Sequence, residues 1–87
     1  LEGNAENVAF IESDKAEVLE VEIGDESVLA GRQIQESVGD LPDGVVVGAI
    51  VRDGVFIAPR GDTVVEAGDN VVVFAAMDVA DDVRAQI

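Results

Sequence analysis

The chain has 87 residues, enough for one small domain with a single core. Nineteen acidic residues against five basic ones give a formal charge of −14, which argues against nucleic acid and anionic lipid headgroups as partners. The absence of cysteine excludes disulfides and thiolate metal sites within the chain and favours the cytosol.

The sequence gives no sign of direct membrane insertion. The longest apolar run, residues 45–51, is far shorter than the roughly 20 residues that a spanning helix needs. The chain also lacks both a signal-peptide pattern and an initial Met, so we expect a piece of a longer cytoplasmic protein.

The acidic residues are dispersed among apolar runs, a pattern unlike that of a disordered acidic tail. Two interpretations remain, an ordinary acidic soluble domain or a protein from a salt-rich cytoplasm. Lys15 is the only lysine and arginine takes the other basic positions, which favours the halophilic interpretation.

In chain order, residues 1–15 read as a lead-in segment in which residues 7–12 could form a short strand, followed by a turn at residues 13–15. Residues 16–23 alternate apolar and acidic side chains, which predicts a strand with one buried face. Ser27 is a candidate N-cap for a short helix over residues 28–37, although Gly31 weakens its first half and favours a start near residue 31. A loop follows at residues 39–44.

The second half of the chain carries the clearest turn signals. Asp53-Gly54 separates two apolar runs and predicts a β-hairpin. Gly61-Asp62 and Gly68-Asp69 predict two further turns, in which glycine supplies a positive φ and the aspartate accepts backbone hydrogen bonds. An apolar strand follows the second of these turns.

The chain then ends in a predicted helix over residues 78–87. Asp78 is its candidate N-cap, and Asp81, Asp82 and Arg84 complement its dipole. Val79, Val83 and Ile87 share one face. The sequence therefore predicts a compact α+β fold with a mainly antiparallel β-sheet, a short helix after the first strand and a C-terminal helix.

Catalysis is excluded by elimination. The chain has no His, Cys or Tyr, and turn or cap chemistry accounts for Ser13, Ser27 and Ser37. No glycine-rich phosphate loop is present, so we expect no nucleotide cofactor in this domain. Asp62 and Asp69 are weak candidates for a metal site, and the turn interpretation of both is preferred.

The order of these motifs resembles the C-terminal domain of TrkA potassium-uptake proteins, also called the RCK C-terminal domain. The resemblance rests on the alternating strand, on Ala30-Gly31-Arg32, on residues 41–44, on residues 50–52 and on the two Gly-Asp turns. It covers residues 16–87. It implies a non-catalytic regulatory domain that dimerises and belongs to a cytosolic protein peripheral to the membrane, partnered with a membrane-embedded potassium transporter. NAD(H) or another nucleotide would then be held by a separate N-terminal domain.

In some relatives this domain binds a regulatory ligand between two copies. We take Arg52, Arg60, Val46 and Pro59 as candidate ligand-binding residues, and leave open that Arg52 forms a strand-end ion pair with Asp53 or Asp62. Cyclic di-AMP is disfavoured, because residues 39–46 carry two aspartates and no basic side chain. Two alternatives remain: a ligand-free oligomerisation domain of another cation transporter or antiporter, and a divalent-metal switch built on carboxylates.

Overall fold

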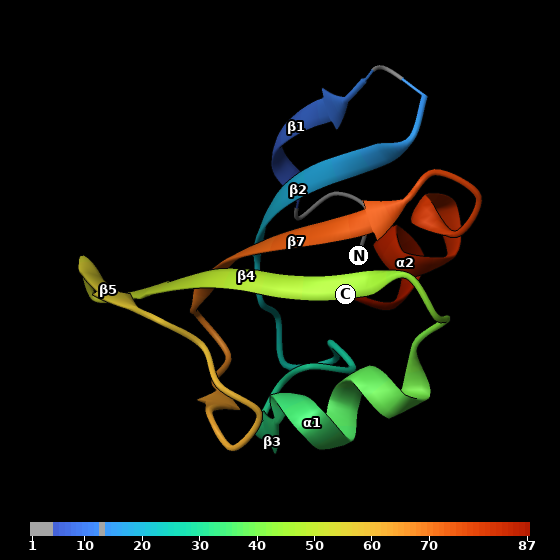
Figure 1. The fold of residues 1–87 in the computed structure, drawn as a ribbon. Coiled ribbons are helices and arrows are strands. Elements are labelled where there is room, and N and C mark those ends of the chain that lie inside the picture. Colours follow the sequence, from blue (N-terminus) through green and yellow to red (C-terminus); the bar gives the residue numbers. More distant parts are fainter. Residues whose placement is uncertain (1–4, 13) are drawn as a thin grey trace.

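The computed structural model describes residues 5–12 and 14–87 and contains a five-stranded sheet of order β1-β2-β7-β4-β5 (Figure 1). Every neighbouring pair in this sheet is antiparallel. The strands are β1 (Ala5–Ile11), β2 (Ala16–Glu22), β7 (Asn70–Ala76), β4 (Val45–Arg52) and β5 (Val55–Ile57). A small second sheet pairs β3 (Arg32–Gln33) with β6 (Val64–Val65).

Two short helices complete the fold: α1 (Ile34–Ser37), continued by a 3-10 turn at Val38–Asp40, and α2 (Ala80–Gln86). The predicted fold class, an α+β domain with a mainly antiparallel sheet and two helices, is confirmed. None of the helices among residues 5–12 and 14–87 is long and apolar enough to cross a membrane.

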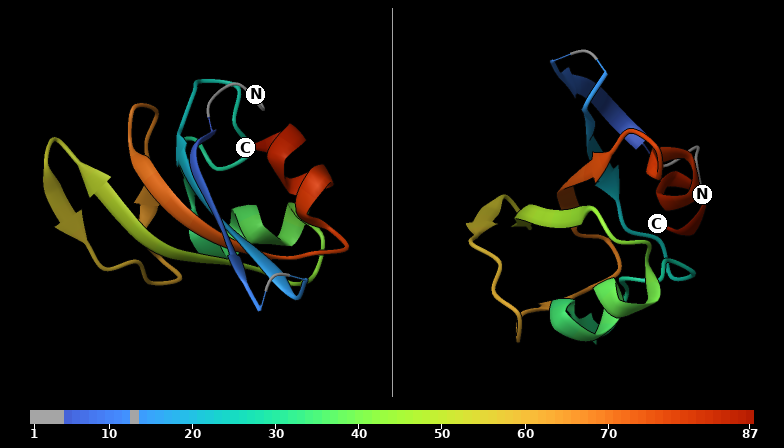
Figure 2. Two further views of the ribbon diagram at one scale, coloured as in Figure 1. Left: turned by 90° about the horizontal axis from the view of Figure 1, so that it is seen from above. Right: turned by 45° about the vertical axis from the view of Figure 1, so that its right-hand side comes forward.

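The core lies between one face of the sheet and the two helices. Alternation along the central strands turns Leu19, Val21, Val71 and Val73 inward, and all four are buried. From the helices, the core is closed by Ile34, Val83 and Ile87. The two helices therefore share the inner face of the sheet, and Figure 2 shows them on the same side of the strands.

The predicted helix over residues 28–37 is wrong in its first half, because α1 begins only at Ile34. Gly31 has a φ of 74°, and its N–H donates to the carbonyl oxygen of Val65 at 2.7 Å. Arg32 and Gln33 then pair with β6, so the backbone is extended until Ile34. Ser27 is buried and accepts a hydrogen bond from the Leu29 N–H, which caps a turn and not a helix. The helical spacing of apolar residues alone could not reveal that the backbone of Arg32 and Gln33 pairs with β6.

The C-terminal helix also begins later than predicted. Its N-cap is Val79, with no side-chain cap, so the assignment of Asp78 as N-cap is wrong. Asp81 and Asp82 do lie in the first turn and Arg84 in the last. Arg84 contacts Asp81 and reaches the buried Glu17 of β2, which fastens the helix to the sheet.

At the N-terminal end, β1 pairs with β2 along its length, with one irregularity between Ala5 and Asn7. Residues 1–4 of the predicted lead-in segment and the predicted turn residue Ser13 lie outside the described residues. The division of the chain at residue 16 stays a prediction.

The β4–β5 hairpin has a two-residue loop, Asp53-Gly54, in which both residues have positive φ, 50° and 78°. Such a loop matches the twist of the strands that it joins. Earlier in β4 the pairing with β7 slips by one residue at Gly48. The chain thus reaches β5 only after β4 has bent, and β5 pairs with no more than the last three residues of β4.

Candidate functional site

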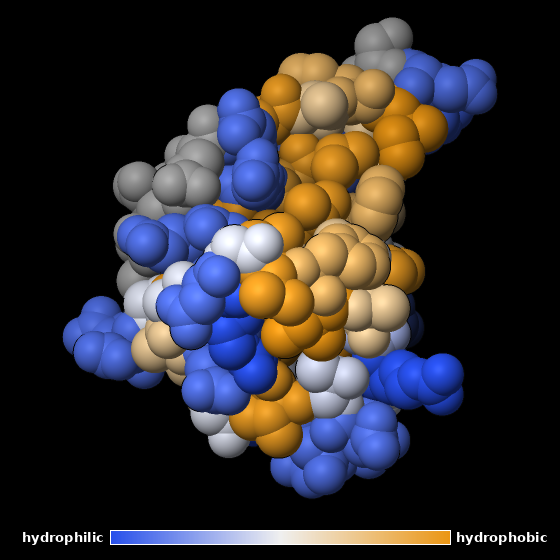
Figure 3. Space-filling model, turned by 90° about the vertical axis from the view of Figure 1, so that its left-hand side faces the viewer, coloured by the Kyte–Doolittle hydropathy of each residue, from blue (hydrophilic) through white to orange (hydrophobic). Residues whose placement is uncertain are grey.

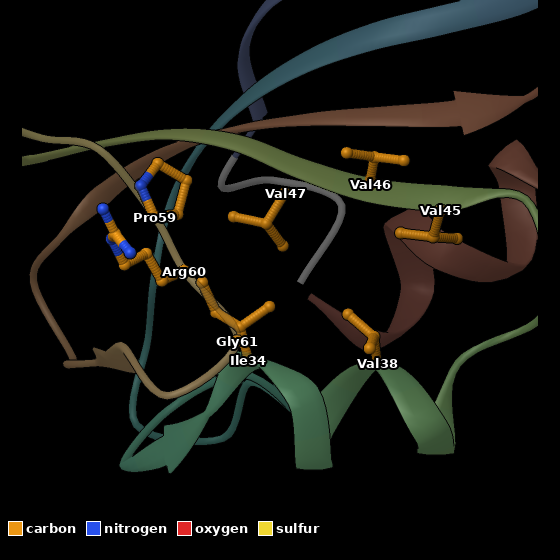
Figure 4. Close-up of a pocket in the computed structure, with 8 residues that line it drawn as sticks. All are labelled: Ile34, Val38, Val45, Val46, Val47, Pro59, Arg60 and Gly61. Atoms are coloured by element: carbon orange, nitrogen blue, oxygen red, sulfur yellow. The ribbon is translucent and has the colours of Figure 1, made fainter.

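A pocket of about 260 Å³ lies beside the first half of β4 (Figure 4). It forms there because β5 pairs only with Ile50–Arg52 of β4 and leaves Val45–Val47 uncovered on that side. Its lining comes from three segments: Ile34 and Val38 of the helical turn, Val45–Val47 of β4, and Pro59, Arg60 and Gly61 of the loop after β5. In Figure 4, Val47 points down from the strand toward Ile34 and Val38.

The loop of residues 59–63 is held against α1 by the backbone. Ile34 N–H donates to the Thr63 carbonyl oxygen at 2.9 Å, and Gln35 N–H donates to that of Gly61 at 2.8 Å. Thr63 also closes the turn, since its hydroxyl oxygen accepts from the Arg60 N–H at 2.9 Å. These bonds fix the backbone at Arg60, so that its side chain starts at the rim of the apolar pocket.

Arg60 differs from the other basic residues of the chain. Lys15, Arg32, Arg52 and Arg84 each lie within 4.0 Å of a carboxylate. Within the described part of the chain, Arg60 forms no ion pair and its side chain is exposed. Its charge is therefore available to an anionic group at the pocket.

Arg52, in contrast, forms ion pairs with carboxylates of its own chain. It donates from Nε and Nη2 to the two carboxylate oxygens of Asp69, both at 2.8 Å, and from Nη2 to the Val64 carbonyl oxygen at 2.9 Å. Its Nη1 lies 2.9 Å from Glu66. Arg52 thus forms carboxylate ion pairs, but with Asp69 and Glu66, and the expected pairing with Asp53 or Asp62 is wrong. Register explains the choice, because Val51 of β4 pairs with Asn70, the residue after Asp69.

Asp69 is the anchor of this second cluster. Its side chain is 2% exposed and also accepts a hydrogen bond from the Glu66 N–H at 2.9 Å. The hydrogen bonds from Arg52 hold the pKa of Asp69 below its usual value, although burial acts in the opposite direction. In return, Asp69 raises the pKa of Arg52.

These contacts bear on the metal hypothesis. Both oxygens of Asp69 already accept hydrogen bonds, and Asp62 is exposed in its turn. In residues 5–12 and 14–87 no group of three potential metal ligands comes together. The arrangement gives the metal switch no support.

Of the four candidate ligand residues, the pocket brings together Arg60, Val46 and Pro59 and leaves out Arg52. Sequence reasoning missed Ile34 and Val38, whose i, i+4 spacing was a detectable signal for one shared helical face. It also missed a partner for the acidic loop, since Arg32 reaches Asp40 at 2.7 Å. The turn glycine Gly68 has a φ of 93°, whereas φ at Gly61 is not positive.

Residues 18–87 match the TrkA-C domain family. The chain belongs to this family. TrkA-C domains are regulatory, non-catalytic domains of potassium uptake proteins.

Curated relatives support the assignment. The Trk system potassium uptake protein TrkA of Azorhizobium caulinodans is 40% identical over 82 residues, which cover 94% of this chain and 17% of that protein. TrkA homolog 2 of Methanosarcina mazei is 34% identical over 70 residues, 80% of this chain and 15% of that protein. The chain therefore spans a small part of the length of the relatives that it matches.

A solved structure described as an RCK domain with cda has the same fold. Its TM-score is 0.61 at 20% identity, and the match covers 80% of this TrkA-C chain and 96% of that one. At this identity the likeness concerns the fold alone.

Proposed function

We propose that this TrkA-C domain regulates a Trk-type potassium uptake protein from the cytoplasmic side of a membrane. Family membership supports the proposal. In this role residues 16–87 are the regulatory unit, and the full-length protein acts on a membrane-embedded potassium transporter. A nucleotide such as NAD(H) would be bound outside this domain, where a glycine-rich phosphate loop can be formed.

The domain acts as a homodimer and receives a small effector at the pocket beside β4. The observation that carries the effector proposal is Arg60, an exposed cation without an ion pair in the described chain, at the rim of a pocket walled by Ile34, Val38 and Val47. This combination suits a ligand with one anionic group and one apolar or aromatic part.

The rest of the surface limits which anion is accepted. The chain carries a charge of −14, so every anion approaches against a repulsive field. Asp40 is partly neutralised by Arg32, but Asp43 has no ion pair within the described residues. A ligand with a single anionic group placed on Arg60 avoids these carboxylates better than a dianion that extends along residues 39–46, so cyclic di-AMP remains disfavoured.

Thermal unfolding at constant ionic strength tests the effector proposal. The panel is AMP, ATP, NADH, cyclic di-AMP, Ca²⁺ and Mg²⁺. A true effector stabilises the fold by about 2.7 kcal/mol at a hundredfold excess over Kd. We expect a shift with AMP, which has one phosphate group and one aromatic base, and we expect Arg60→Gln to abolish this shift and Lys15→Gln to retain it.

Lys15→Gln is a matched control, because it removes the same charge from an exposed side chain in the β1–β2 turn. Loss of the shift in both variants would show a general charge effect and contradict the pocket. If no compound of the panel shifts the unfolding temperature, a ligand-free dimerisation domain is the better account. A cation shift that Asp62→Asn removes would restore the metal switch.

We also propose that the protein works in a salt-rich cytoplasm. The support is the excess of 19 acidic residues over five basic ones. One of the relatives, 37% identical over 75 residues, is TrkA of Halomonas elongata. At about molar salt the repulsion among these carboxylates is screened to roughly 3 Å.

A further inference from the structure

A second hollow, of about 320 Å³, lies on the β1, β2 and β7 strands, away from the pocket beside β4. It is lined by Asn7, Val8, Ala9, Val18, Glu20 and Val72, and it shares no residue with the lining of the first pocket. Four of these six residues are apolar. Figure 3 shows hydrophobic colour in a nearly continuous band from the β1–β2 hairpin toward the β4–β5 hairpin.

Strand register divides this hollow into a polar end and an apolar end. Glu20 of β2 pairs with Asn7 on one side and with Val72 on the other. Two residues earlier in β2, Val18 pairs with Ala9. Side chains of paired residues lie on one face, and two residues of a strand span about 7 Å. A ligand that lies along β2 would therefore meet a carboxylate and an amide at one end and apolar side chains at the other.

Glu20 is the one charged residue of the lining, and it has no counter-charge. Its side chain is half-buried and accepts a hydrogen bond from the Asn7 amide nitrogen at 2.5 Å. Within residues 5–12 and 14–87, no lysine or arginine lies within 4.0 Å of the Glu20 carboxylate. Glu17 of the same strand, on the opposite face, is paired with Arg84.

The unpaired carboxylate restricts what the hollow can hold. A ligand that covers Glu20 removes water from it, which is unfavourable unless the ligand brings hydrogen-bond donors and positive charge. An anion would instead add repulsion to a chain of charge −14. A primary ammonium has three donors and no acceptor, so it suits both Glu20 and the Asn7 amide oxygen, which accepts while the amide nitrogen donates.

We propose that this hollow binds a primary ammonium group carried on a short aliphatic chain. The nitrogen lies at Glu20 and Asn7, and a chain of about four or five carbons covers the 7 Å or so to Val18 and Ala9. This chemistry is shared by free alkylamines and by the lysine side chain. The site is independent of the effector pocket, where Arg60 would receive an anion, and of the state of assembly.

Titration with pentylamine, followed through the backbone amide NMR signals at pH 7 and constant ionic strength, tests the site. The amine is protonated at this pH. We expect saturable shifts that are concentrated on the lining segments of β1, β2 and β7. 1-Pentanol should bind at least about tenfold more weakly, because it brings no charge to Glu20. Equal binding of the alcohol, or no saturation by the amine up to about 50 mM, would overturn the proposal.

Two glutamates of β2 give a matched pair of variants. Glu20→Gln keeps the shape of the side chain and an acceptor for Asn7, and should raise the Kd of pentylamine at least about tenfold. Glu22→Gln removes the same charge from the same face of the same strand, but outside the lining, and should leave Kd within about twofold. Equal weakening by both would show a general attraction to the acidic surface and would contradict the site.

The apolar end is tested without any change of charge. Ala9→Leu fills the space beside Val18 and should raise the Kd of pentylamine at least about tenfold. Ala49→Leu makes the same substitution in β4, at a residue that pairs with Val72 but does not line the hollow, and should leave Kd within a few-fold. Unfolding curves verify that all variants are folded. An unchanged Kd in folded Ala9→Leu would overturn the placement of the chain.

A peptide distinguishes the two sources of the ammonium group. The acetylated and amidated tripeptide valine-lysine-valine should shift the same amides as pentylamine and lose affinity in Glu20→Gln. Tighter binding of the peptide than of pentylamine would identify a lysine of a protein segment as the occupant, and weaker binding would identify a free amine. Shifts of a different set of amides by the two ligands would contradict a shared site.

Discussion

The guanidinium of Arg52 grips the carboxylate of Asp69 at both oxygens, at 2.8 Å each, and this pair joins the end of β4 to the turn before β7. The turn also shares backbone bonds with the end of β2, since Gly68 N–H donates to the Ile23 carbonyl oxygen and Ile23 N–H to that of Asp69. Three strands therefore meet at one buried carboxylate.

Asp69→Asn should lower the free energy of unfolding by about 2 kcal/mol at neutral pH, because a charged acceptor of several hydrogen bonds is lost. Asp62→Asn, on an exposed turn aspartate, should change it by less than about 0.5 kcal/mol. Urea unfolding of the two variants measures the difference. Equal effects would mean that the Arg52 contact adds nothing to stability.

The Asp69 carboxylate should also change how the free energy of unfolding depends on pH. Arg52 lowers the pKa of folded Asp69 below its unfolded value near 3.8, so the stabilisation is complete above pH 4. It is then lost as the pH falls through the folded pKa. The stability gap between wild type and Asp69→Asn should thus narrow below pH 4. Comparing the two proteins cancels the protonation of the other carboxylates, and a gap that stays constant down to pH 2 would contradict the assignment.

Gly68→Val should destabilise the fold by at least about 1 kcal/mol, because its φ of 93° suits a β-branched residue poorly. Space is not the cause, since a Cβ at Gly68 would meet nothing within 4 Å. Gly39→Val is the control at a glycine with equal space and no positive φ. Thermal unfolding of both variants separates backbone strain from side-chain size, and similar losses would refute the backbone argument.

Gly48→Ala should cost about 1–3 kcal/mol through overpacking. A Cβ at this bulge would clash with the Phe74 ring, so the ring must move. Phe74→Leu in the same chain should recover part of the loss, which a double-mutant cycle would show as a coupling of at least about 0.5 kcal/mol. If the stability changes of the two substitutions are additive, the loss caused by Gly48→Ala comes from the bulged backbone and not from the Phe74 ring.

Salt should strengthen the dimer. Two chains of −14 repel over about 30 Å at 10 mM ionic strength and over only about 3 Å in molar salt. We expect the dimer Kd to fall at least tenfold between these conditions when measured by sedimentation. An unchanged Kd would remove the argument for a surface adapted to high salt.

Sequence pattern alone determined most of the elements, because their causes are local. The alternation in residues 16–22 follows from the two-residue period of a strand, and Asp53-Gly54 specifies its hairpin through two positive φ values. The family resemblance rested on the same turns, whose order along the chain survives without any knowledge of contacts.

Only the tertiary structure decided which distant groups meet. From the sequence, Asp53 and Asp62 were the expected ion-pair partners of Arg52. The antiparallel register of β4 and β7 instead brings Asp69, seventeen residues away in the chain, next to Arg52. Likewise, pairing with β6 kept Arg32 and Gln33 extended against their helical spacing. The pocket with Arg60 and the apolar sheet face formed by Val18, Val72 and Phe74 also arise from register, since a shift of one residue would exchange the two faces of every strand.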